Sequence, residues 1–365
     1  EINPDYVDAL FNRGIIFKQL RNFDQALSDF GQALNLNSDH LGALNSRGNT
    51  LRELNRFEEA IDDYQKAIMI RPNYGPAIDG LVTLLVGYTP QRKIKNPILK
   101  ANQSIRKIDT NEFFTNPISD FQAVEMVKRC SQIIEKHCKN LKLDRSQIYR
   151  RNAVDMKCAR HMSIFERYNI IPEFCFGCFK VQVEPRSILE QIKLFIVFDR
   201  LVLVNNNTRK CMVELRPNMP GFYKGLIYCS SSEEAKTVLK NVDTILQRKM
   251  GTSLPAKIKR GCSEYSISFP EFEETDDLGM PIMHYNKDWK NIESTHDKKY
   301  PSATDTKIAL TSPGISLNDA LIIQNWINYS HIIGDKTNDI FKMDSVSSKV
   351  ITEQASRRLK NYTFI

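Results

Sequence analysis

The pattern of apolar and polar positions changes once along the chain, near residue 88. Before that point, small and apolar residues return at intervals of 34 positions. The recurring pairs include Ala9 and Ala43, Leu10 and Leu44, Leu20 and Leu54, and Phe23 and Phe57. Such a period is typical of stacked helical units that bury their apolar faces only against their neighbours. The pattern therefore predicts an α-helical solenoid over residues 1–87, with two full units and a third that is partial or capping.

The residues at fixed places in each unit resemble those of tetratricopeptide repeats. Gly14 and Gly48 stand where the two helices of a unit cross closely in that family, and Ala26 and Ala60 stand at the matching place on the second helix. Pro72 occupies the expected breaker position. Residues 1–6 match residues 69–74, so we expect further repeats upstream of this sequence.

The resemblance implies a concave groove lined by the first helix of each unit. In this chain the groove would present Asn12, Asn45, Ser46, Asn49 and Arg52. Side-chain amides both donate and accept hydrogen bonds, so they can hold an extended peptide backbone. We therefore expect the repeats to bind a protein or peptide partner.

Residues 88–118 are polar and contain three prolines, which indicates a connector. An α+β domain is expected over residues 119–365. The apolar pattern of residues 119–168 predicts two helices. The first begins with a capping box of Ser119 and Gln122, and the second spans residues 145–168. A C-terminal helix and tail are expected over residues 270–365, with residues 271–315 largely irregular and the helix over residues 317–333.

Between these helices, residues 179–269 alternate between the strand and the helix periods. Strands are expected at 179–183, 211–215, 223–229 and within 256–269, and helices after residue 188 and between 231 and 251. The order βαββαβ predicts a ferredoxin-like sandwich, in which two helices cover one face of four antiparallel strands.

Composition agrees with a globular protein: 41% of the 365 residues are apolar and 26% are charged. No apolar run is long enough to predict a membrane span, so no membrane partner is expected. The eight cysteines lack the compact spacing of a secreted disulfide framework. We interpret them as reduced thiols or metal ligands in a cytoplasmic protein.

Basic charge is concentrated in the middle of the chain. Residues 88–180 carry 18 Lys and Arg against 9 Asp and Glu, whereas residues 1–87 carry 8 against 12. A solvated helical face is the favoured interpretation, and contact with phosphate groups is the alternative.

A zinc site is one interpretation of the cysteines. Cys158 and His161 form a C-x2-H pair, and Cys175 and Cys178 form a C-x2-C pair after a short interval. Two close pairs of this kind suit a tetrahedral ion. Packed structural side chains are the favoured alternative, and an iron–sulfur or redox role is a weaker one.

One edge of the predicted sheet gathers further candidates. Arg209, Lys210, Lys259 and Arg260 are expected there, which predicts an electropositive edge that binds an anionic ligand. On the open face of the sheet, Lys224, Leu226 and Tyr228 resemble one strand of an RNA recognition motif, but they bring only one aromatic ring for base stacking. Nucleic acid is therefore a less favoured partner.

Two classes of function follow. The favoured one is an adaptor, in which the repeats bind a partner and the α+β domain is a second module. The alternative is an enzyme or nucleic-acid-binding module with a zinc or cysteine-rich, electropositive site at the sheet edge. The sequence contains no phosphate-binding glycine loop, G-x-S-x-G elbow or H-E-x-x-H helix, and it leaves open whether the chain is an enzyme.

Overall fold

The computed structural model describes residues 4–91, 96–150, 157–217, 219–274, 281–300, 311–342 and 348–362. The chain divides into two compact units. Unit 1 comprises Glu1–Ile108, Cys130–Leu143 and Ile315–Leu321, and unit 2 comprises Asp109–Arg129, Asp144–Gly314 and Ile322–Ile365. The domain boundaries expected near residues 87 and 118 stay predictions.

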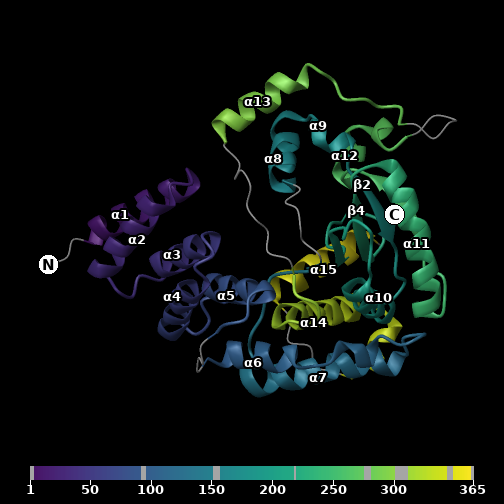
Figure 1. Ribbon diagram of the computed structural model, residues 1–365, viewed down its shortest axis with the longest axis horizontal. Helices are drawn as coiled ribbons and strands as arrows, with labels where there is room; N and C mark the ends of the chain where they lie inside the picture. Colours follow the sequence, from purple (N-terminus) through teal and green to yellow (C-terminus); the bar gives the residue numbers. More distant parts are fainter. Residues whose placement is uncertain are drawn as a thin grey trace. The chain divides into compact units, whose positions relative to one another are not determined.

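Unit 1 begins with five consecutive helices, which we call the repeat arm (Figure 1). They are α1 (Pro4–Gln19), α2 (Phe23–Leu36), α3 (Leu41–Glu53), α4 (Phe57–Ile70) and α5 (Gly75–Gly87). Each helix packs against the next one along the chain. The small residues of the 34-residue period lie inside these contacts, since Ala26 and Ala60 are fully buried. The helix pairs expected over residues 1–87 are therefore present.

The recurring glycines allow an aromatic ring to lie directly on the first helix of each pair. A Cβ atom on Gly14 would lie 2.6 Å from the ring of Phe30, and one on Gly48 would lie 2.9 Å from the ring of Tyr64. Both distances are shorter than carbon atoms tolerate. Any larger residue would push the second helix away from the first.

An ion pair also repeats with the period and joins the two helices of each pair. Arg13 donates to both carboxylate oxygens of Asp29 over 2.7 Å, and Arg47 donates to those of Asp63 over 2.8 and 2.6 Å. Asp29 and Asp63 are buried. Two-pronged contacts of this geometry are among the stronger charge-assisted hydrogen bonds.

Three further helices lie wholly or partly in unit 1: α6 (Pro97–Arg106), α7 (Asp120–Cys138) and α14 (Leu317–Ile332). The buried Asn102 of α6 accepts a hydrogen bond from the Leu317 N–H over 3.0 Å. The predicted capping box of α7 is confirmed, because the Gln122 N–H donates to Ser119 Oγ over 3.2 Å and the Ser119 N–H donates to Gln122 Oε1 over 3.0 Å. The expected C-terminal helix is confirmed as α14.

Unit 2 is built on an antiparallel sheet with the strand order β1-β3-β4-β2-β5. The helices α10 (Ile188–Arg200) and α11 (Ser232–Met250) pack on one face of this sheet (Figure 1). From β2 to β5 the element order is strand, helix, strand, strand, helix, strand, as the sequence predicts. The strands are β1 (Gln147–Arg150), β2 (Phe179–Val183), β3 (Arg209–Val213), β4 (Tyr223–Cys229) and β5 (Ala256–Arg260).

Alternation along the strands separates a helix-covered face from an open face. Gly225 of β4 lies against α10, because a Cβ atom there would be 2.5 Å from Leu194 and 3.0 Å from Phe198. Its neighbours Lys224 and Leu226 therefore belong to the opposite face. The register of the five strands extends this division across the whole sheet.

Three sequence predictions about unit 2 are wrong in detail. Within the helix predicted over residues 145–168, Gln147–Arg150 forms the edge strand β1, and of the residues described there Cys158–Tyr168 form a helix, α8. Pairing with β3 gives this short segment its strand conformation. The predicted fourth strand ends at Arg260, because Gly261 turns the chain at a φ of +56° into α12 (Ser263–Ser268).

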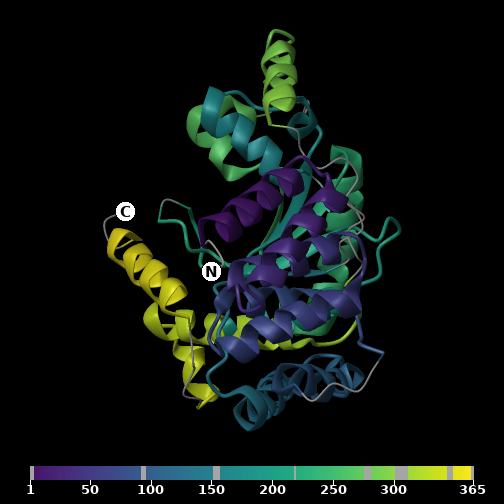
Figure 2. The same ribbon diagram turned by 90° about the vertical axis from the view of Figure 1, so that its left-hand side faces the viewer.

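The third error concerns residues 271–315, which were expected to be irregular but contain α13 (Trp289–Lys299). This helix lies beside α8 (Figure 2). Arg160 of α8 joins the two by ion pairs with Asp297 over 2.6 Å and Glu293 over 3.0 Å. Arg160 is more than 130 residues away from Glu293 and Asp297 in the sequence, so local sequence patterns do not indicate this contact.

A small second core supports the end of the sheet near Gly261. It contains Ile171, Cys175, Tyr265 and Phe272, contributed by the segments around α9 (Glu173–Phe176), α12 and the 3-10 helix η2 (Pro270–Phe272). The chain ends with the 3-10 helix η3 (Lys336–Ile340) and with α15 (Lys349–Tyr362).

Candidate functional site

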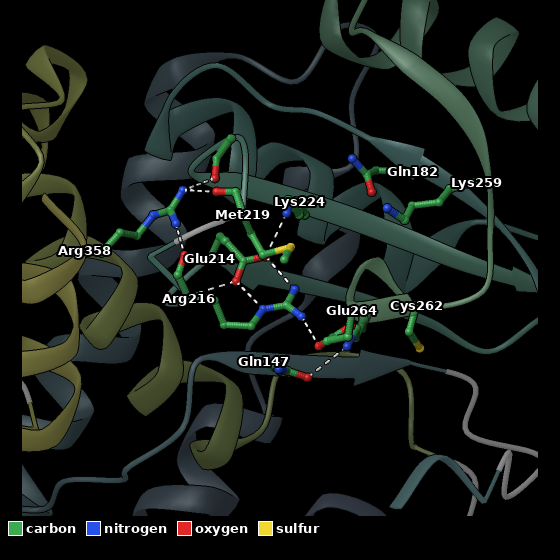
Figure 3. A network of polar contacts seen from close by, with 12 residues as sticks. Gln147, Gln182, Glu214, Arg216, Met219, Lys224, Lys259, Cys262, Glu264 and Arg358 are labelled. Atoms are coloured by element: carbon green, nitrogen blue, oxygen red, sulfur yellow. Dashed lines mark hydrogen bonds and ion pairs between the residues drawn. The ribbon is translucent and has the colours of Figure 1, made fainter. Parts of the chain in front are cut away.

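A cavity of about 330 Å³ lies on the open face of the sheet in unit 2. We call it the sheet-face cavity; Figure 3 shows part of its lining. Outward-facing side chains of all five strands form its floor, and residues 261–264 together with Cys158 complete its walls. The sheet register brings these residues together, since each strand contributes alternate positions to one face.

The lining of the sheet-face cavity is rich in basic side chains. One comes from each of β2, β3, β4 and β5, and a fifth follows β3, whereas the described residues contribute only two carboxylates to the same lining. Walls that carry one sign of charge in excess raise the local concentration of oppositely charged ligands. The basic residues are Lys180, Lys210, Lys224, Lys259 and Arg216, and the carboxylates are Glu214 and Glu264.

Glu214 is the buried centre of an ion-pair network (Figure 3). It accepts hydrogen bonds from Arg216 over 2.8 and 2.7 Å and from Lys224 over 2.7 Å. Burial alone would raise the pKa of Glu214, but the two cations outweigh it and lower the pKa to about 2. Burial lowers the pKa of Lys224, which has one carboxylate partner and is repelled by Arg216. Arg216 also pairs with Glu264.

Arg358 of α15 fixes the segment that carries Arg216 (Figure 3). This buried guanidinium donates to the carbonyl oxygens of Arg216, Met219 and Gly221, the last two over 2.6 and 2.8 Å. A helix at the end of the chain thus holds one wall of the sheet-face cavity in place.

Lys180 and Lys210 extend the basic lining toward the other end of the sheet. The Lys180 ammonium is buried, donates to the Gly261 carbonyl over 2.7 Å and lies 3.3 Å from the Cys262 sulfur. Lys210 donates to Gln147 Oε1 over 3.0 Å. Each ammonium also lies over a tyrosine ring: Lys180 is 5.2 Å from the ring centre of Tyr228, and Lys210 is 5.3 Å from that of Tyr149.

The structure divides the predicted anion-binding residues between the two faces of the sheet. Lys210 and Lys259 line the sheet-face cavity. Arg209 instead donates to the Leu201 carbonyl over 2.7 Å, and Arg260 donates to main-chain carbonyls that include that of Phe176. Adjacent strand residues point to opposite faces of the sheet, so two consecutive basic residues lie on different faces and contact different groups. Anion binding by this set of four stays a prediction.

Lys180 and Lys224 are not among the residues predicted to bind an anion, although the sequence carries a signal for them. Lysine occupies an outward position on each of the four strands of the βαββαβ pattern. The strand order places these positions side by side. That order cannot be read from any single strand.

The four residues predicted to bind zinc lie in different surroundings. Cys158 is exposed and lines the sheet-face cavity, whereas His161, Cys175 and Cys178 are buried. The Cys175 thiol lies 3.2 Å from the Tyr265 hydroxyl. Burial raises the pKa of Cys175 to about 12 and that of Cys178 to about 11, which favours neutral thiols. Within the described ranges, no three His, Cys, Asp or Glu side chains are grouped to hold a metal ion. Zinc binding stays a prediction.

A second candidate site lies on the repeat arm, on the side of α1 and α3 that carries the predicted groove residues; these are the first helices of the two repeats, and we call this side the first-helix face. Asn45, Asn49 and Arg52 share one side of α3, since they are separated by four and three residues. Asn12 is exposed on α1. The side-chain oxygen of Asn45 is buried and has no hydrogen-bond partner within the described part of the chain.

The other predicted groove residues also make contacts within the arm. Asn49 Oδ1 accepts a hydrogen bond from the Tyr64 hydroxyl over 2.8 Å, and Arg52 reaches the Gly80 carbonyl over 3.4 Å. Ser46 is buried. Partner binding by Asn12, Asn45, Ser46, Asn49 and Arg52 stays a prediction, and two of these residues already support the packing of the arm.

Comparison with known families decides the nature of the repeat arm. The model of the tetratricopeptide repeat family matches residues 7–40 and 42–74. These two segments are tetratricopeptide repeats. No curated protein matches the chain.

Tetratricopeptide repeats indicate protein–protein interaction, because stacked helix pairs offer an extended surface to another chain. The matched residues run from α1 to the start of α5, so they cover most of the repeat arm. No described helix is both long and apolar enough to cross a membrane.

Proposed function

We propose that the chain is an adaptor whose tetratricopeptide repeats hold an extended segment of a partner protein on the first-helix face of the repeat arm. This face comprises the side of α1 that carries Asn12 and the side of α3 that carries Asn45 and Asn49. The family match to residues 7–40 and 42–74 supports an interaction role, and the position of Asn45 supports this particular face.

The unpartnered oxygen of Asn45 is the observation that carries the proposal. A buried polar atom without a partner costs free energy, and rotation of the Asn45 side chain toward a peptide N–H would remove that cost on binding. The amide can also donate from its nitrogen, so one side chain can hold both polar groups of an extended backbone. Asn12 on the preceding first helix would supply a second amide.

We further infer that β2 to β5 with α10 and α11 form a ferredoxin-like sandwich, with β1 added at the edge next to β3. The antiparallel order β3-β4-β2-β5 and the packing of both helices on one face support this assignment. Such a core brings no activity by itself, since the same fold carries unrelated functions.

A peptide selected against the purified chain tests the adaptor function. Asn45→Ala should weaken the affinity of that peptide about five- to tenfold, the usual effect of losing one buried hydrogen bond. Asn35→Ala is the matched control, because Asn35 is exposed on the second helix α2. Fluorescence anisotropy with a labelled peptide measures both variants.

Asn49 is left unchanged in this test because its replacement would also remove the contact with Tyr64. Equal affinity of Asn45→Ala and the original chain, or a loss in Asn35→Ala instead, would place the partner on another surface. Failure to select any peptide under these conditions would count against the recruitment of an extended segment.

A further inference from the structure

Two lysines of the sheet-face cavity have no carboxylate partner within the described residues. Lys180 contacts a carbonyl oxygen, a thiol and a tyrosine ring, and Lys210 contacts an amide oxygen and a tyrosine ring. The two carboxylates of the lining are instead engaged by Arg216, and one of them also by Lys224. Positive charge is therefore balanced at one end of the cavity and unbalanced at the other.

The unbalanced end is also poorly solvated. Lys180 is only 6% exposed, and burying an ammonium without a counter-charge is unfavourable. An ammonium has three N–H donors, and the described residues offer Lys180 one carbonyl oxygen and one weakly accepting sulfur. A bound oxyanion would supply both the missing charge and the missing acceptor.

The shape of the sheet-face cavity limits the size of this anion. Its volume of about 330 Å³ lies at the lower end of the range of small-molecule sites. Met212 and Leu226 give it an apolar floor. The space suits a small anion of the size of a metabolite.

A nucleic-acid strand fits the same face less well. An ammonium group lies over one ring face of Tyr149 and of Tyr228, so it competes with a stacking base for that face. Glu214 and Glu264 would repel the phosphates of a strand that continued past the basic end.

We propose that the sheet-face cavity binds a small oxyanion, a phosphorylated or carboxylated molecule, through Lys180, Lys210 and Lys259. Lys259 joins this set because it lines the cavity and pairs with Glu273, over 2.7 Å, which does not line it. The network of Glu214, Arg216 and Lys224 holds the floor in shape, and the thiol of Cys262 lies beside the anion.

Isothermal titration calorimetry with pyrophosphate and with citrate tests this site and separates the two sources of negative charge. One of the two probes should bind in a saturable way at one site per chain. Lys210→Gln should weaken that binding at least about tenfold, since a charge-assisted hydrogen bond is removed. Lys259→Gln should weaken it in the same direction and serves as a second variant if Lys210→Gln misfolds.

Lys257→Gln is the matched control. Lys257 lies two positions before Lys259 on β5 and pairs with Glu184 over 2.9 Å, but it does not line the cavity. The Lys257→Gln variant should bind the probe with the same affinity as the original chain. Alkylation of Cys262, followed by mass spectrometry, gives an independent readout, because the bound probe should slow the reaction.

Three results would overturn the proposal. The first is the absence of saturable binding with both probes. The second is unchanged affinity in Lys210→Gln and Lys259→Gln. The third is tight binding of single-stranded RNA that neither probe displaces, which would assign the face to nucleic acid.

Discussion

Replacing Glu214 by glutamine should destabilise unit 2 by about 3 kcal/mol at neutral pH. The change keeps the size of the side chain and removes its charge. Glu214 is fully buried and binds two cations, so its removal leaves the buried Lys224 without its carboxylate. Two independent arguments give the magnitude.

The first argument uses the pKa of Glu214, which falls from an ordinary 4.5 to about 2 in the folded protein. At about 1.4 kcal/mol for each pKa unit, this difference corresponds to about 3 kcal/mol. The second argument is the usual cost of removing one partner of a buried ion pair, about 3 to 5 kcal/mol. Because the folded pKa is depressed, the stabilisation is complete above pH 4.5 and is lost as the pH falls toward 2.

Tryptophan fluorescence during denaturant unfolding measures this effect on unit 2. Both tryptophans of the chain, Trp289 and Trp326, belong to that unit. Trp326 is fully buried and donates to the Ser146 carbonyl over 2.8 Å, so its emission should change on unfolding. The free energy of unfolding should differ between Glu214→Gln and the original chain near neutral pH, and the difference should shrink as the solution is acidified below pH 4.5.

Glu184→Gln is the control for the loss of a sheet carboxylate. Glu184 pairs with Lys257 at the surface, where such contacts contribute about 1 kcal/mol or less. A loss below about 1 kcal/mol in Glu214→Gln as well would contradict this prediction, because the buried ion pair would then contribute no more than an exposed one. A difference that stays constant with pH would refute it too.

Two further predictions concern the repeat arm and the cysteines. Gly48→Ala should lower the stability of the repeat arm by about 1 to 3 kcal/mol, because the added methyl group overpacks against Tyr64. Gly31→Ala, whose added Cβ meets no atom within 4 Å, should raise helix stability by about 0.5 to 1 kcal/mol. Thermal unfolding followed by circular dichroism compares the two variants, and equal effects would contradict the close helix crossing at Gly48. If Cys158, His161, Cys175 and Cys178 bind zinc, metal analysis of the purified protein should find one zinc ion per chain. Cys175→Ser should remove this ion, whereas the control Cys130→Ser, at a buried cysteine of α7, should retain it. Purified protein without zinc would contradict the zinc hypothesis.

Local patterns account for much of the fold. The 34-residue period predicted the helix pairs of the repeat arm, and the capping residues predicted the start of α7. The alternation of apolar residues located β2, β3 and β4 and the helices between them. These features depend on neighbours within one turn, one strand or one repeat, so the sequence carries them directly.

Distant contacts account for the errors. Residues 147–150 form a strand because β3 pairs with them, although they lie within a stretch whose pattern suggested one helix. The helix α13 was missed, and its ion pairs to Arg160 join residues far apart in the sequence. Burial among distant segments overrides weak local preference at such places.

The pattern of the chain indicates the repeats, their interaction role and the alternation of side-chain directions within the predicted strands. The arrangement of the strands in space adds that Lys180, Lys210, Lys224 and Lys259 share one cavity, that Glu214 is buried between Arg216 and Lys224, and that Arg209 and Arg260 donate to main-chain carbonyls instead. The physical reason is that periodicity fixes the direction of a side chain along its own strand, whereas strand order and packing fix which other side chains it meets.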